Sequence, residues 1–371
     1  MKVVIAIDSF KGSLSSLQAG NAVKEAVLRL NADADVVVKP LADGGEGTVA
    51  AMAESADAEM IACTVTGPLL QPVNASYCIL KNSRTAVIEM AAAAGITLVS
   101  ADERNPMETT TYGVGELIKD AIAKGCRRFI VGIGGSATND GGTGMLAALG
   151  YEFLDKDGNP IALGGKGLKD LYAIKADRVL PELSDCSFQI ACDVTNPLCG
   201  EKGCSAVYGP QKGATPQMIA EMDKWLLNYA ALAKADKDHP GVGAAGGLGF
   251  AFFAFTNSVL KSGIQIILDE ISLENDIKNA DLVITGEGRL DSQTVMGKAP
   301  IGVARLAKKY GKKVIAFSGC VTEDAEICNE HGIDAFFPIL RAVTTLEAAL
   351  EEKNAAKNLT ATAYQVLRLV L

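Results

Sequence analysis

The sequence predicts an α/β protein built on largely parallel sheets. Short apolar runs typical of buried strands alternate along the 371 residues with longer segments of helical periodicity. Several of these runs end in glycine-rich loops that also carry charged residues. A hydrophobic content of 49% with 21% charged residues is sufficient for two buried cores, so we expect two domains.

The first predicted sheet is assembled from both ends of the chain. It begins with a strand at 3–7, an amphipathic helix at 16–30 and a strand at 35–41. Two strands do not make a domain, and a matching series follows much later, with strands at 281–285, 313–318 and 335–337 and helices at about 301–310, 324–331 and from about 354. Together they predict a flavodoxin-like, doubly wound parallel sheet of order 2-1-3-4-5 that is interrupted by a second α/β domain.

The predicted domains are therefore a discontinuous flavodoxin-like domain, residues 1–62 plus 277–371, and an inserted α/β domain, residues 63–276. The insert has its own apolar runs, which predict strands near 73–80, 85–89, 128–133 and 188–192. No internal repeat or low-complexity linker separates the parts.

A glycine-rich loop, GIGGSATNDGGTG at 132–144, follows one predicted strand of the insert. Backbone N–H groups in such a loop can approach an anion, so we expect a phosphate site there. Gly132 to Ala137 also matches the dinucleotide fingerprint G-x-G-x-x-A, which is a weak signal alone. A turn that only lets a helix pack closely is the alternative, but Asn139 and Asp140 between glycine pairs favour a ligand site.

Charged residues follow the first three strands of the first predicted sheet. Ligands of open α/β sheets bind beyond the carboxyl ends of the strands, so these loops are expected to share one site. The candidates are Asp8, Ser9 and Lys11 after the first strand, Asp43 and Glu46 after the second, and Arg289 and Asp291 after the third. Four of these candidates have an ordinary alternative: Asp43 and Glu46 as charges at a helix N-terminus, and Lys11 and Arg289 as surface cations.

Two further segments of the insert carry candidates. Asp193 follows an apolar strand and is expected to accept a hydroxyl proton or to hold a magnesium ion, unless it only caps the turn before Pro197. The run 243–249 contains Gly246 and Gly247 and is compatible both with a phosphate-binding helix N-terminus and with a close packing seam.

Composition excludes several classes of function. The formal charge of −9, without a stripe of Lys and Arg, argues against nucleic acid as a partner. No apolar run approaches the roughly 20 residues of a membrane span, and a strand begins at once without a signal segment, so we expect a cytoplasmic protein. Nine scattered cysteines indicate reduced thiols, and a zinc site at Cys199 and Cys204 is disfavoured.

Histidine is scarce, which restricts the mechanism. The only two, His239 and His331, fall in a predicted loop and at a predicted helix end. A Ser-His-Asp hydrolase is therefore disfavoured, and we expect a carboxylate as general base.

Seven sequence blocks together resemble the bacterial glycerate kinase family, type I. They are DSFKGSLS at 8–15, PLADGGEGT at 40–48, GIGGSATNDGG at 132–142, CDVTNPL at 192–198, GPQKGA at 209–214, GAAGGLGF at 243–250 and TGEGRLDSQT at 285–294. Their order along nearly the whole chain is also similar to the family's. The resemblance implies a two-domain fold and ATP-dependent phosphorylation of D-glycerate, with 2-phosphoglycerate favoured over 3-phosphoglycerate. One departure is Ile7, where a proline commonly precedes the aspartate.

Phosphoryl transfer requires positioning and charge neutralisation, which this inventory of residues can supply. We expect ATP phosphates, with Mg²⁺, to contact the two glycine-rich segments, through Gly134, Gly135, Ser136, Thr138, Asn139, Asp140, Gly141, Gly246 and Gly247. Catalytic roles are expected for Asp193 as base, Lys11 as the neutralising cation, and Asp8. Glycerate would be held by Arg289, Ser9 and Asp291, and Mg²⁺ by Asp43 and Glu46. A homo-oligomer is left open.

Two other classes remain as alternatives. An NAD-dependent hydroxyacid dehydrogenase would use the G-x-G-x-x-A match, but it usually has a histidine acid/base and carries that loop after its first strand. A ligand-binding protein of the periplasmic type has a similar two-domain shape, but it would require a signal segment.

Overall fold

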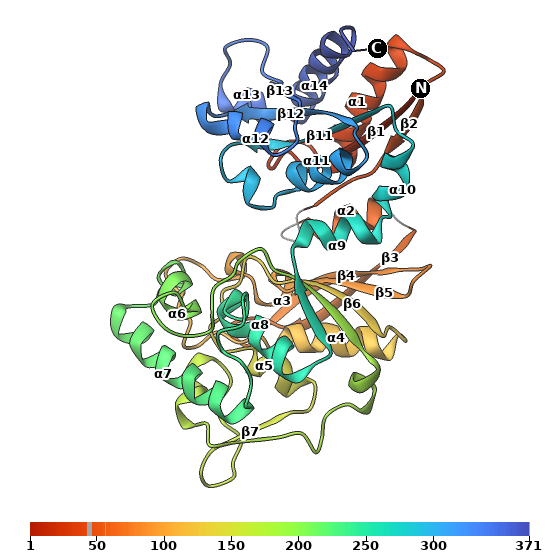
Figure 1. Ribbon diagram of the computed structural model, residues 1–371. Helices are drawn as coiled ribbons and strands as arrows, with labels where there is room; N and C mark the ends of the chain where they lie inside the picture. The colour runs from red at the N-terminus through yellow and green to blue at the C-terminus, as the bar shows by residue number, and fades with distance from the viewer. Residues whose placement is uncertain (43–46, 56, 371) are drawn as a thin grey trace. The chain divides into compact units, whose positions relative to one another are not determined.

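The computed structural model describes residues 1–42, 47–55 and 57–370, and its chain divides into two compact α/β units (Figure 1). Unit 1 comprises Met1–Asp43, Ala50–Ala56 and Ile264–Leu371, and unit 2 comprises Gly44–Val49 and Asp57–Gly263. The expected class, a mixed α/β protein with parallel sheets, is confirmed. The contact division differs from the expected boundaries at 62/63 and 276/277, because β3 already pairs in the sheet of unit 2 and α9 and α10 belong to unit 1.

Unit 1 contains a five-stranded sheet in the order β13-β12-β11-β1-β2, with every neighbouring pair parallel. Its strands are β1 (Lys2–Ile7), β2 (Asp35–Val38), β11 (Leu282–Leu290), β12 (Lys313–Val321) and β13 (Ala335–Pro338). Val3, Ile5 and Ile7 on one face of β1 and Val4 and Ala6 on the other are all buried. Both faces of the sheet are therefore covered at β1, as expected for the centre of a doubly wound fold.

The helices of unit 1 come from both ends of the chain. Figure 1 shows α14 (Glu352–Leu367) alongside α1 (Ser16–Leu30), and the Thr360 hydroxyl donates to the Ala22 carbonyl at 3.0 Å. The capping box of Ser15 and Gln18 fixes where α1 begins. The remaining helices are α9 (Gly263–Glu270), α10 (Leu273–Lys278), α11 (Ala299–Lys309), α12 (Ile327–Glu330) and α13 (Leu346–Leu350), and α2 (Thr48–Ser55) lies at the division between the units.

Unit 2 contains a six-stranded sheet in the order β10-β9-β6-β5-β4-β3. The first four of these strands are parallel, and β4 and β3 continue the sheet as an antiparallel pair. The strands are β3 (Ala58–Thr66), β4 (Pro72–Leu80), β5 (Thr85–Glu89), β6 (Arg128–Gly132), β9 (Ser187–Ala191) and β10 (Ser258–Lys261), with a separate pair of β7 (Glu152–Leu154) and β8 (Ala173–Lys175).

Aromatic and aliphatic side chains fill the core of unit 2. The rings of Phe129 on β6 and Phe188 on β9 are stacked with centroids 4.7 Å apart. The helices around this core are α3 (Ala91–Ala94), α4 (Tyr112–Ala123), α5 (Thr143–Ala148), α6 (Cys204–Tyr208), α7 (Pro216–Ala233) and α8 (Ala244–Phe255). Among the described residues, no helix combines the length and the apolar character needed to cross a membrane.

Strands β11 and β12 extend beyond their neighbours at the carboxyl edge of the sheet. Pairing between β1 and β11 ends at Ile7 and Gly286, whereas β11 and β12 stay paired as far as Arg289 with Cys320 and Leu290 with Val321. The extension is a parallel two-stranded ribbon, and it carries charged residues.

Candidate functional site

Two buried carboxylates lie where the strand order of unit 1 reverses, between β1 and β11. The Asp8 N–H donates to the Gly286 carbonyl at 2.9 Å, which places Asp8 beside Glu287 at the carboxyl ends of the two strands. Both residues are only 8% exposed. In doubly wound sheets this reversal point is where ligands bind, so unit 1 has acidic groups at the expected position.

The loop after β1 is held by a side-chain hydroxyl that bonds backbone groups and by close packing against β11. The Ser16 hydroxyl donates to the Ile7 carbonyl and accepts from the Leu41 N–H at 2.7 Å. Gly288 lies against the backbone of Phe10 and Lys11. A Cβ added at Gly288 would lie 3.4 Å from the Lys11 backbone nitrogen. The side chain of Lys11 is exposed and Ser9 is half-buried. This arrangement leaves the Lys11 ammonium accessible to an anionic ligand.

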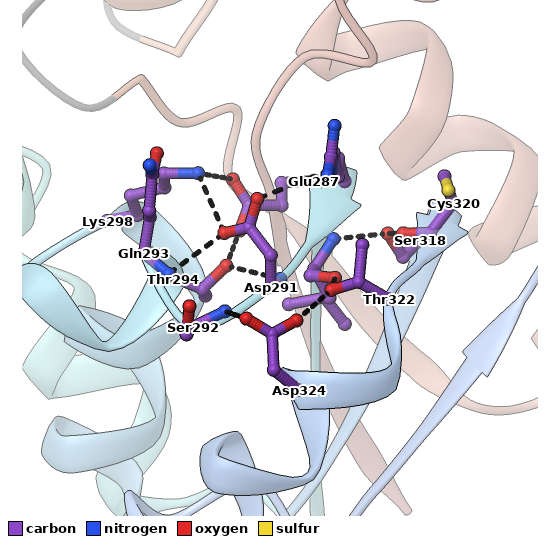
Figure 2. Close-up of polar contacts among 12 residues, drawn as sticks. Glu287, Asp291, Ser292, Gln293, Thr294, Lys298, Ser318, Cys320, Thr322 and Asp324 are labelled. Atoms are coloured by element: carbon purple, nitrogen blue, oxygen red, sulfur yellow. Dashed lines mark hydrogen bonds and ion pairs between the residues drawn. The ribbon is translucent and has the colours of Figure 1, made fainter.

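A charged cluster lies at the carboxyl end of β11 and in the turn after it, and is drawn in Figure 2. The Lys298 Nζ lies 3.8 Å from Glu287 Oε2 and 3.6 Å from Asp291 Oδ1, between the two carboxylates. The Thr294 hydroxyl donates to Glu287 Oε1 at 2.7 Å, and the Asp291 N–H donates to the same hydroxyl oxygen at 3.2 Å. These contacts hold Glu287, which is buried, by a hydrogen bond and an opposite charge.

Arg289 and Asp291 do not have the same environment. Arg289 Nε lies 3.3 Å from Asp291 Oδ2, with 64% of the arginine side chain exposed against 15% of the aspartate. The guanidinium thus remains open for a second carboxylate, whereas Asp291 already contacts Lys298 and accepts from the Gln293 N–H at 3.0 Å. Asp291 therefore positions the two cations, and its place in direct contact with a substrate stays a prediction.

Asp324, in the segment after β12, binds the turn that follows β11. Its carboxylate accepts from the Ser292 N–H at 3.2 Å and from the Thr322 hydroxyl (Figure 2). Hydrogen bonds from Ser292 and Thr322 lower the pKa of Asp324 to about 2. The turn after β11 is thereby joined to the segment after β12.

The glycine-rich loop of unit 2 begins at the carboxyl end of β6. It pairs with the segment after α3, since Ile96 N–H donates to the Gly135 carbonyl at 2.8 Å and Ala137 N–H to the Ala94 carbonyl at 2.9 Å. From Ile133 to Gly144, only Gly134 and Gly135 are exposed. A ligand can therefore approach the loop at this glycine pair, with Ser136, which is 7% exposed, next to it.

Asp140 has a different place from the one expected for an ATP contact. Its side chain is fully buried, and it accepts from the Thr111 N–H and hydroxyl, both at 2.8 Å, and from the N–H groups of Gly142 at 3.0 Å and Gly144 at 3.3 Å. Burial raises the pKa of Asp140, and these donors oppose that rise. The carboxylate accepts hydrogen bonds from N–H groups of the loop that was expected to bind phosphate. Asp140 therefore stabilises the conformation of the loop.

Thr138 and Asn139 are also fully buried rather than open to solvent. The Asn139 amide donates to the Ser205 hydroxyl at 2.9 Å, while Thr138 Oγ1 and Asn139 Oδ1 have no hydrogen-bond partner among the described residues. Direct contact of either side chain with ATP would require the loop to rearrange.

A buried lysine, Lys212, lies behind the loop. The short turn after α6 places its Nζ 2.7 Å from both Ser136 Oγ and the Thr138 carbonyl oxygen. The side chain is 2% exposed, and burial lowers its pKa to about 8 while nearby Cys204 and Asp140 oppose the shift. Lys212 is not among the site residues predicted from the sequence, although it stands inside the block at 209–214.

Gly246 and Gly247 form a packing seam in this structure. Both have positive φ, of 64° and 89°. A Cβ at Gly246 would lie 2.0 Å from the Thr138 carbonyl oxygen, and one at Gly247 would lie 2.8 Å from the Gly141 Cα. Gly141 donates its N–H to the Gly246 carbonyl at 2.9 Å. Of the two alternatives for this run, these contacts support the close packing seam, and phosphate contact by Gly141, Gly246 and Gly247 stays a prediction.

Asp193 lies at the same carboxyl edge of unit 2 as Gly134. The two residues follow Ala191 and Gly132, which are register partners in β9 and β6. Asp193 is exposed, and its Oδ1 accepts from the Gly263 N–H at 3.1 Å, at the beginning of α9. The carboxylate is thus accessible for chemistry and is also a helix cap.

The expected magnesium ligands, Asp43 and Glu46, lie outside the described residues. Within the described part of the chain, no three His, Cys, Asp or Glu side chains gather closely enough to hold a metal ion. We therefore assign no metal ligands from the geometry.

Sequence reasoning missed Lys212, Glu287, Thr294 and Lys298. Glu287 stood in the quoted block at 285–294, and its place directly after an apolar strand was a signal that could have identified it. Lys298 lies outside every block, and only the turn at 294–296 brings it back to Glu287.

Each unit thus presents polar and charged groups at the carboxyl edge of parallel strands, which defines a two-unit α/β protein of the ligand-binding, doubly wound class. The chain matches the sequence model of the Glycerate kinase family over residues 3–371. This chain belongs to the glycerate kinase family.

Particular relatives cover nearly the whole chain. A glycerate kinase of Haemophilus influenzae is 48% identical over 100% of this chain and 99% of the relative, and the glycerate 2-kinase of Escherichia coli is 49% identical over 94% and 93%. A crystal structure of a protein provisionally assigned as glycerate kinase 2, from Salmonella typhimurium LT2, is 49% identical. It matches with a TM-score of 0.92 over 100% of this chain and 98% of that one.

Proposed function

We propose that this protein transfers the terminal phosphoryl group of ATP to D-glycerate, with 2-phosphoglycerate the favoured product. Membership of the glycerate kinase family supports the reaction. The name of the Escherichia coli relative, a glycerate 2-kinase, supports the choice of hydroxyl. A cytoplasmic location, small-molecule substrates without nucleic acid or membrane as partners, and a possible homo-oligomer stay as predictions from the sequence.

The observation that carries the proposal in unit 1 is the group of charged residues at the reversal point of the sheet. Lys11 and Arg289 are exposed cations beside the buried acids Asp8 and Glu287. The planar guanidinium of Arg289 suits the glycerate carboxylate, with Ser9 as a neutral hydrogen-bonding partner. Lys11 would neutralise charge on the transferred phosphoryl group, and Asp8 would orient the reacting groups.

In unit 2, we propose that the ATP phosphates bind at Gly134, Gly135 and Ser136. This narrows the contact set expected from the sequence, since the N–H groups of residues 141–145 have acceptors within the protein. Backbone N–H groups of a glycine pair and a serine hydroxyl are ordinary phosphate ligands.

Asp193 is proposed as the general base that accepts the glycerate hydroxyl proton, because its carboxylate is exposed at the edge that carries Gly134. Mg²⁺ bound with ATP would neutralise phosphate charge. Asp43 and Glu46 remain its proposed ligands.

The product formed by the purified full-length protein tests this proposal. The protein is incubated with D-glycerate, ATP and Mg²⁺, and the phosphorus NMR spectrum is compared with authentic 2- and 3-phosphoglycerate. Direct turnover by added enolase, without phosphoglycerate mutase, is an independent check for the 2-phosphate. A 3-phosphate would contradict the proposed regiochemistry, and no product from D-glycerate would contradict the activity. A thermal shift with ATP and none with NAD would exclude the dehydrogenase alternative.

A further inference from the structure

Lys212 is a charged group buried in unit 2 for which the proposed function has no role so far. It is 2% exposed, and its ammonium donates to two acceptors among the described residues, Ser136 Oγ and the Thr138 carbonyl oxygen, both at 2.7 Å. Both acceptors belong to the glycine-rich loop. Burial of an ammonium is costly, so a protein that keeps one at this position gains something from its charge.

The geometry at Ser136 shows what that charge can do. A lysine ammonium only donates, so the Ser136 oxygen must be the acceptor in this contact. Its own hydroxyl proton has no acceptor among the described residues. Because Ser136 adjoins Gly134 and Gly135, the exposed pair of the loop, the proton can be donated to a ligand there.

We propose that Lys212 is a positioning residue that acts through Ser136: its ammonium polarises the serine hydroxyl, which donates to an anionic oxygen of the nucleotide at Gly134 and Gly135. The inference rests on the proposed function, because it takes ATP as the anion. Lys212 itself does not touch the ligand. A hydrogen bond donated by a polarised hydroxyl to a phosphate oxygen is stronger than one from an isolated serine.

A matched control separates this role from simple loop anchoring. The Thr109 hydroxyl, which is also buried, donates to the Ala137 carbonyl at 2.9 Å, just as Lys212 donates to the carbonyl of the next residue. Thr109→Val therefore removes an anchor of the same loop without touching Ser136.

The test is a double-mutant cycle on ATP binding by the full-length protein, measured by calorimetry without glycerate. Ser136→Ala and Lys212→Met should each weaken ATP binding by ~10- to 100-fold, and the double variant should be no weaker than the weaker single variant. In the kinetic assay, the KM for ATP should rise while the KM for glycerate changes little. Thr109→Val should lower thermal stability but leave the ATP affinity within about threefold.

Effects that multiply in the double variant would overturn the coupling, and an unchanged ATP affinity in Lys212→Met would remove the role altogether. If wild-type protein binds ATP but makes no phosphoglycerate, the proposed function fails while this inference is still tested. If wild-type protein does not bind ATP, both fail.

A second measurement needs no lysine variant. The titratable groups that act on the Lys212 ammonium are Cys204 on α6 and Asp140 in the loop. Loss of the ammonium charge as pH rises through about 8 should weaken ATP binding by wild-type protein, and Ser136→Ala should remove this pH dependence. If ATP binding by Ser136→Ala weakened by the same factor over this pH range, the charge would not act through the serine.

Discussion

The carboxylate of Asp140 accepts from both the backbone N–H and the hydroxyl of Thr111, each at 2.8 Å, which joins the glycine-rich loop to the beginning of α4. The same carboxylate accepts from Gly142 and Gly144 at the beginning of α5. One fully buried side chain therefore fixes three segments of unit 2.

Asp140→Asn should destabilise the protein by ~1–3 kcal/mol, because an amide nitrogen would face N–H donors that now have an acceptor. Urea unfolding followed by circular dichroism measures the loss. Asp155→Asn is the control, since Asp155 accepts two backbone N–H groups at 2.9 Å in an exposed turn and should matter much less. Equal losses in the two variants would contradict the role given to Asp140.

Lys212 predicts a dependence of stability on pH. Its folded-state pKa, about 8, lies below its ordinary value of 10.5, so between these two values the unfolded chain binds more protons than the folded one. The cost of burying the charge is complete below about pH 8 and disappears as pH rises towards 10.5. Wild-type stability should therefore rise relative to Lys212→Met over this interval, by on the order of 3 kcal/mol at most. Urea midpoints at pH 7, 8.5 and 9.5 measure it, and a constant difference would contradict burial of a charged ammonium.

Asp193→Asn should reduce kcat by about two to four orders of magnitude with a modest effect on ATP binding, because an amide cannot accept the substrate proton. Asp193 also accepts from the Gly263 N–H, and the amide oxygen of asparagine can keep this contact, so the variant removes the proton acceptor without removing the acceptor for α9. An asparagine variant with more than half of wild-type activity would exclude Asp193 as base.

Arg289→Lys should mainly raise the KM for glycerate, because an ammonium cannot reproduce a planar contact at two points. Initial rates at saturating ATP measure this effect. Arg305→Lys, at an exposed position of α11 in the same unit, is the matched control. A raised KM for ATP with an unchanged KM for glycerate would transfer Arg289 to nucleotide binding.

A fragment of residues 1–276 should be insoluble or molten, because it lacks β11, β12 and β13 of the five-stranded sheet. The apolar strand β1, all of whose residues from Val3 to Ile7 are buried, would lose its partner β11. The measurements are the solubility of the fragment and the cooperativity of its thermal unfolding. A soluble fragment with a cooperative transition would contradict the interrupted-domain hypothesis.

Strands buried on both faces were predictable from sequence, whereas the two edge strands of the six-stranded sheet were not. β1 and β6 are continuous apolar runs and lie within a residue of the expected 3–7 and 128–133. β3 and β10 were missed, because most of their residues are exposed or only half-buried and their hydrophobic pattern is therefore weak. The same weakness explains why the first boundary was expected at 62/63 rather than before β3.

For the candidate site, sequence indicated the loops but not the direction of individual side chains. Asp140 and Lys11 both stand in polar glycine-containing loops, yet one is fully buried and the other exposed. Burial of a charge depends on donors from distant segments, such as Thr111, which no local pattern reveals. Lys212 was missed for the same reason.

The paired ends of β11 and β12 mean that the backbone of this part of the candidate site is ordered before a ligand binds. Arg289 and Leu290 belong to a backbone ladder with Cys320 and Val321 rather than to a free loop. The conformational entropy of this backbone is thus lost when the protein folds, and glycerate would not have to offset it on binding. Arg289 can reach a carboxylate by side-chain rotation alone, because its backbone is already held in the ladder.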